Sequence, residues 1–90
     1  METDQRPAIY PEHHFEIEGV IIRQWPSTPT YWAVFADGSQ PGCITVDANN
    51  QPYFHSYYQF ESLNAEQKLV VGRAVNHVLD WIALTKRLKS

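Results

Sequence analysis

The sequence changes from a strand pattern to a helix pattern within residues 53–82, YFHSYYQFESLNAEQKLVVGRAVNHVLDWI, and this change decides the fold class. The first eight residues, 53–60, include five aromatic side chains, a composition that favours a β-strand over a helix. Asn64 and Gln67 then have the spacing of a capping box, in which two side chains satisfy the free amides at a helix start. We therefore expect a strand over residues 53–60 and a helix that begins at about residue 65.

The expected helix continues to about residue 88, because no proline interrupts it. Its apolar positions have the spacing of one helical face: Val71, Val75, Val78 and Ile82. Such a face needs a partner layer to bury it, and the segments before residue 61 are the candidates for that layer.

Three further strands are expected upstream, over residues 15–25, 30–36 and 43–46, because each is rich in β-branched and aromatic residues. Turn-forming residues separate them, including Asp37-Gly38, and a bulge is expected at Gly19. The sequence predicts an α+β fold, a four-stranded antiparallel meander with one C-terminal helix packed on a face (β-β-β-β-α), in two layers. Residues 1–13 are expected to form an extended or frayed N-terminal arm, and residues 14–90 a single domain.

Size and composition agree with one small globular domain. The chain has 90 residues and a mass of 10.4 kDa, which leaves no room for a second domain of ordinary size. Apolar residues make up 43% of the chain and charged residues 19%, which excludes a disordered, collagen-like or low-complexity protein.

The charge and the cysteine content indicate which class of partner and which cellular compartment to expect. The net charge is −3, with eight acids and two bases in residues 1–61 and two acids and five bases in residues 62–90. An acidic body of this kind argues against direct binding of nucleic acid. A single cysteine, Cys43, and no apolar run long enough for a leader or a membrane span predict a cytoplasmic protein without a membrane partner.

Strand alternation assigns the side chains to two faces of the sheet. The expected core face contains Phe15, Ile17, Trp32, Val34, Ile44, Val46, Phe54, Tyr58 and Phe60. The opposite face contains Tyr31, Phe35, Cys43, Thr45, Tyr53, His55 and Tyr57, and the sequence supplies no second helix to cover it. An uncovered aromatic face indicates an interaction surface.

The sequence therefore predicts a non-enzymatic binding protein that dimerises through this aromatic face, or covers a functional surface of a partner protein with it. The expected binding residues are Tyr31, Phe35, Tyr53, His55 and Tyr57, with Glu16 and Glu18 as charges that steer a partner. Inhibitors, immunity proteins and phage- or plasmid-encoded antagonists are small acidic proteins of this class, and a basic nucleic-acid-handling protein would suit the acidic body.

A structural alternative is that the N-terminal arm folds over one face of the sheet and buries it. Two alternative functions also remain open from the sequence alone. The aromatic residues could line a pocket for a nucleotide or another small molecule, or His77 and Asp80, three residues apart on the expected helix, could act as a base and its orienting carboxylate. The chain has no catalytic motif, phosphate loop or paired metal-ligand motif, and the adjacent His13 and His14 would point to opposite faces of a strand. We therefore expect neither a metal nor a cofactor.

Overall fold

The structure is a computed structural model that describes residues 13–89. The arm expected over residues 1–13 therefore lies outside the described residues, except for His13. The elements in chain order are β1 (His14–Ile17), β2 (Val20–Trp25), β3 (Thr28–Ala36), β4 (Ser39–Val46), β5 (Pro52–Ser56), α1 (Tyr58–Glu61) and α2 (Ala65–Lys89).

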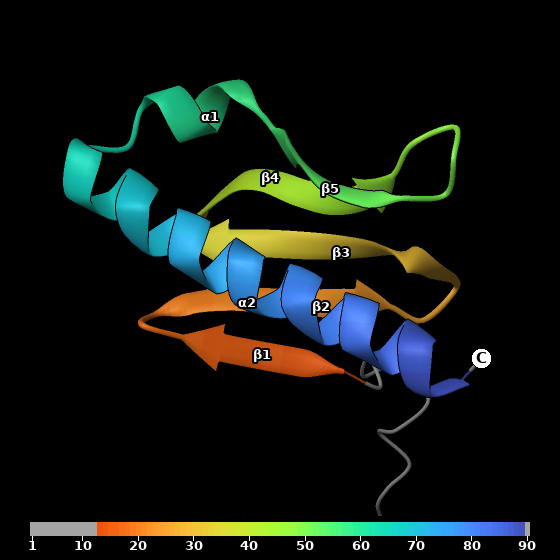
Figure 1. Cartoon of the computed structure of the whole chain (residues 1–90). Coiled ribbons are helices and arrows are strands. Elements are labelled where there is room, and N and C mark those ends of the chain that lie inside the picture. Colours follow the sequence, from red (N-terminus) through yellow and green to blue (C-terminus); the bar gives the residue numbers. More distant parts are fainter. Residues whose placement is uncertain (1–12, 90) are drawn as a thin grey trace, which may run out of the picture.

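The predicted α+β architecture is confirmed. The strands form one antiparallel sheet whose spatial order, β1-β2-β3-β4-β5, is the order of the chain, and α2 lies across one face of it (Figure 1). The sheet has five strands where the sequence analysis predicted four.

The additional strand arises because residues 15–25 form a hairpin and not one bulged strand. Glu18 and Gly19 have φ angles of 52° and 85°, and positive φ at both central residues is the mark of the two-residue turn that best matches strand twist. The chain reverses there, so that Ile17 pairs with Val20 and β1 runs back along β2. Asp37 and Gly38 form a second turn of this kind, between β3 and β4.

The prediction of a strand through residue 60 is wrong after Ser56. The backbone N–H of Tyr57 donates to the carbonyl of Pro41 at 2.7 Å, and the chain then turns into the short helix α1. Tyr58, which was expected in the core, is 80% exposed on α1, whereas Phe60 packs against the core.

The start of α2 follows the predicted capping box. The Asn64 N–H donates to the Gln67 side-chain oxygen at 3.1 Å, and the Gln67 N–H donates to the Asn64 side-chain oxygen at 2.8 Å. The helix then buries Val71, Ala74 and Val78 against the sheet, as its apolar spacing predicts.

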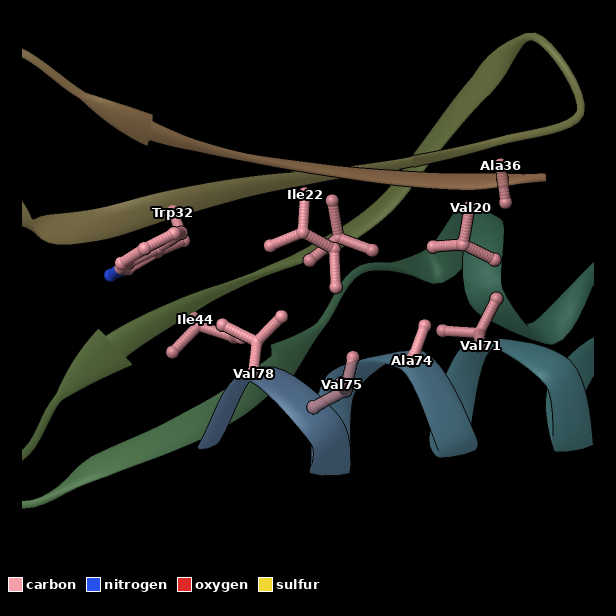
Figure 2. Packing of buried hydrophobic residues seen from close by; sticks show 10 residues of the cluster. Val20, Ile22, Trp32, Ala36, Ile44, Val71, Ala74, Val75 and Val78 are labelled. Carbon is pink, nitrogen blue, oxygen red and sulfur yellow. The ribbon is translucent and has the colours of Figure 1, made fainter. Parts of the chain in front are cut away.

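The hydrophobic core lies between α2 and the sheet (Figure 2). Ile22, Val34 and Ile44 come from three adjacent strands and are completely buried, with Trp32 beside them. Each fully buried Val or Ile side chain contributes about 1.5–3 kcal/mol to stability, so this layer fixes which face of the sheet α2 covers. The side chains that alternate with these core residues therefore point to the opposite face of the sheet.

Candidate functional site

The sheet surface opposite α2, which we call the open face, is not covered by any helix or strand of the described residues. Because side chains alternate along a strand, the neighbours of the core residues point to this face. One row of directly paired residues crosses all five strands on it: His14, Arg23, Ala33, Cys43 and His55.

Aromatic rings gather along this row. Trp25 and Tyr31 meet edge to face with ring centroids 5.7 Å apart, and His55 contacts both Tyr57, at 5.5 Å, and Tyr53, at 6.5 Å. Edge-to-face pairs of this kind are a favourable ring geometry. Trp25 and Tyr53 remain 40% and 42% exposed, so their contacts within the chain leave much of each ring accessible.

Polar atoms connect the middle of the aromatic group. The Gln40 side-chain amide donates to the Tyr31 hydroxyl at 3.2 Å, and the hydroxyls of Tyr31 and Tyr57 lie 3.4 Å apart. Hydrogen bonding with Tyr31, followed by hydrogen bonding with Cys43 and by partial burial, raises the pKa of Tyr57 well above its usual value. The Tyr57 phenol therefore stays neutral at physiological pH.

The structure brings most of the predicted binding residues together on the open face. Tyr31, Tyr53, His55 and Tyr57 are joined by ring and hydroxyl contacts, and Phe35 lies on the same face opposite Ile21. Ile21 in turn pairs with Glu16, which places this carboxylate on the open face beside the edge of the sheet.

Glu18 is the predicted residue that does not join this group. It lies in the β1–β2 turn, where its carboxylate accepts two hydrogen bonds from Arg73 of α2, at 2.8 and 3.0 Å. Hydrogen bonding to Arg73 lowers the pKa of Glu18 and raises that of Arg73. Glu18 thus connects the turn to the helix and leaves Glu16 as the carboxylate on the open face.

Two residues of the open face, Arg23 and Trp25, were missed by the sequence analysis. The signal was present in the expected core residues, whose positions change from odd at Phe15 and Ile17 to even at Trp32 and all later members. A turn at Glu18-Gly19 explains that change and sends the odd positions of β2 to the open face. A bulge at Gly19 explains the parity equally well, so the sequence is compatible with both arrangements.

Arg23 has an unusual environment for a charged side chain. Its Nε atom is shielded from solvent and has no hydrogen-bond acceptor within the part of the chain that the structure describes. A buried donor without a partner costs about 1–3 kcal/mol relative to one that is satisfied.

The two residues of the catalytic alternative lie on α2. His77 and Asp80 are both exposed, and no hydrogen bond joins them in the described structure. The His77 ring instead meets the Phe15 ring in a T-shaped arrangement, with the ring centroids 5.8 Å apart.

The adjacent histidines are separated as predicted. His13 lies against Trp32 and Trp81 on the α2 side, whereas His14 joins the row on the open face. Over residues 13–89 no group of three or more His, Cys, Asp or Glu side chains could hold a metal ion, and no helix there is long and apolar enough to cross a bilayer.

For the pocket alternative, the question is whether the predicted aromatic residues line a hollow. A hollow of about 300 Å³ lies between the two hairpin turns and the start of α2, with Val20, Ala36 and Val70 among its lining residues. A second, of about 220 Å³, lies between Trp32, Val46 and Ile82. Both are on the α2 side of the sheet, so the predicted aromatic residues of the open face line neither of them.

Comparison with known proteins adds no relative: no protein-family model, curated protein or solved structure matches this chain. The function of the chain is therefore inferred from the geometry of its open face.

Proposed function

We propose that the protein is a small non-enzymatic binding protein, and that the open face of its sheet is the surface through which it contacts another protein chain. The observation that carries this proposal is the grouping of Trp25, Tyr31, Tyr53 and Tyr57 on a face that no described element covers. Such an activity suits an inhibitor, an immunity protein or an antagonist carried by a phage or plasmid.

The composition of the open face supports a protein contact. Residues that dominate binding energy in protein interfaces are enriched in Trp, Tyr and Arg, and they occur near the centre of the contact. Here the Tyr31 ring contacts Trp25, and the Tyr31 hydroxyl meets Tyr57 and Gln40, so the rings are held before a partner arrives. Rings that are already ordered lose less conformational entropy on binding.

The charges on the face disfavour a nucleic-acid ligand. Binding a phosphate backbone requires several Lys or Arg side chains on one surface. The described part of the open face offers Arg23 alone, and Glu16 lies on the neighbouring strand. A protein partner needs no such excess of positive charge.

The single cysteine fits an intracellular protein. Cys43 is 4% exposed and has no disulfide partner, since the chain contains no second cysteine. We place the protein in the cytoplasm on this ground, because a buried thiol without a partner is at home in a reducing compartment.

The proposal is tested by truncating two exposed rings of the face. Trp25→Ala and Tyr53→Ala should each weaken binding to a protein that co-purifies from the host by about tenfold or more, since aromatic anchors at a contact centre contribute about 2 kcal/mol or more. The measurement is native mass spectrometry on the gently purified wild type and variants.

The matched control is Tyr58→Ala, which removes an 80% exposed ring of α1 outside the open face and should leave binding unchanged. Circular dichroism must show that all three variants fold. A partner that is retained equally by Trp25→Ala and Tyr53→Ala would show that the open face is not the contact surface.

A further inference from the structure

Among the described residues, the open face carries two opposite charges that have no ion-pair partner. Arg23 pairs across the strands with His14, and Glu16 pairs with Ile21, so the two charged residues lie on a diagonal of adjacent strands. Within the described chain neither forms an ion pair, and the Arg23 Nε is shielded from water as well. The face therefore carries one cation, Arg23, and one anion, Glu16, and neither is paired among the described residues.

We propose that a second copy of this chain packs its open face against this one, and that Arg23 of each copy bonds Glu16 of the other. This inference rests on the proposed function of the face as a protein contact, and it names the occupant. In a two-fold symmetric pair every contact occurs twice, so a face that carries one cation and one anion can satisfy both in the copy opposite. A face with a single sign of charge would repel its own copy.

The resulting assembly has four layers, α2–sheet–sheet–α2. Packed sheets lie about 10 Å apart, and side chains from the two inner faces fill the space between them. Trp25 and Tyr53, each about two-fifths exposed, and Phe35, on the same face, supply apolar side chains for that space.

The size of the face predicts a dimer of moderate affinity. Five strands about 4.8 Å apart and about 20 Å long give roughly 480 Å² per copy, so two copies bury roughly 1,000 Å², near the lower limit for a specific interface. We therefore expect association in the micromolar range, with a dimer that dissociates on dilution.

Sedimentation equilibrium from about 5 to 200 μM brackets that range and tests the inference without any other ligand. The wild-type mass should rise with concentration from 10.4 kDa toward twice that value. Trp25→Ala and Tyr53→Ala should each raise the dissociation constant by about tenfold or more, and Tyr58→Ala should not change it.

A charge exchange tests the pairing itself. Arg23→Glu and Glu16→Arg should each weaken self-association when alone, because like charges then face each other. An equimolar mixture of the two variants should associate more strongly than either variant alone. In the mixed dimer, a glutamate faces an arginine at both of the two contacts between positions 16 and 23. Circular dichroism of each variant establishes that it is folded.

Three results would overturn the inference: a monomer at every concentration, a dimer that the face variants leave intact, or a mixture no stronger than its components. The first of these, combined with loss of a co-purifying protein in Trp25→Ala, would reject the second copy and keep the proposed function. Face variants that alter neither self-association nor partner capture would reject both.

Discussion

At position 42 the sheet has no room for a side chain. A Cβ on Gly42 would meet the backbone carbonyl of His55 and, at 2.7 Å, the ring of Phe54, because β4 and β5 pack closely there. Gly72 in α2 is the contrasting case, since a Cβ at that position would meet nothing within 4 Å.

Substitution by alanine should therefore have opposite effects at the two glycines. Gly42→Ala should lower the free energy of unfolding by about 1–3 kcal/mol through overpacking. Gly72→Ala should raise it by about 0.5–1 kcal/mol, because glycine is unfavourable inside a helix. Urea denaturation followed by tryptophan fluorescence measures both, and an unaffected Gly42→Ala would contradict the pairing of β4 with β5.

The Tyr57 phenol should remain protonated in the folded protein where an unfolded tyrosine ionises. Hydrogen bonding with Tyr31 and Cys43 raises its pKa, so its neutral form is the one that folding favours. The stability that it contributes is fully present below the unfolded value of about 10 and is lost as the pH rises above it.

An ultraviolet titration of tyrosinate checks this expectation. At about pH 11, where an unfolded tyrosine is about nine-tenths ionised, the folded protein should ionise about one tyrosine fewer than the protein in denaturant, and Tyr57→Phe should abolish that difference. Equal ionisation of the folded and denatured wild type would show that Tyr57 is not held by these hydrogen bonds.

At the scale of elements, the start of α2 depends on a short local motif. Asn64 and Gln67 each accept a backbone hydrogen bond from the other, which satisfies amides that the helix itself cannot pair. Because the motif is contained in four residues, the sequence predicted it and the structure confirms it. The length of α2 was predictable for the same reason, since helical spacing is a local pattern.

Asn64→Ala should lower the free energy of unfolding by about 1 kcal/mol through loss of the cap. Asn76→Ala is the matched control, because Asn76 is an exposed residue inside the same helix and should tolerate the change. Thermal unfolding monitored by circular dichroism distinguishes the two. Equal stability of both variants would show that the capping box does not hold the helix start.

The strands were harder to predict than the helix because their limits depend on contacts between distant residues. Tyr57 still bonds Pro41 of β4, and the chain turns into α1 directly afterwards, a change of direction that no pattern within residues 53–60 reveals. The Glu18-Gly19 turn lacks the Asn or Asp that is typical of the first position of such a turn. The residues around it therefore have the pattern of one continuous strand.

At the scale of the whole molecule, two properties could be derived from the sequence: the two-layer architecture and the existence of an aromatic face opposite the helix. Which charges belong to that face could not be derived. Glu16 and Glu18 are equivalent in the sequence, yet Arg73 holds Glu18 at the turn beside α2 while Glu16 stays on the open face. The separation depends on where α2 crosses the sheet, a relation between residues 55 positions apart.

The order of strands along the chain also bears on how the protein is made. Each strand pairs with the strand that precedes it, so the sheet can grow hairpin by hairpin as the chain leaves the ribosome, with short loops to close at every step. The helix that buries the core is synthesised after all five strands. Until it emerges, the nascent sheet exposes apolar residues on both faces, and this is the interval in which chaperones would have most to protect.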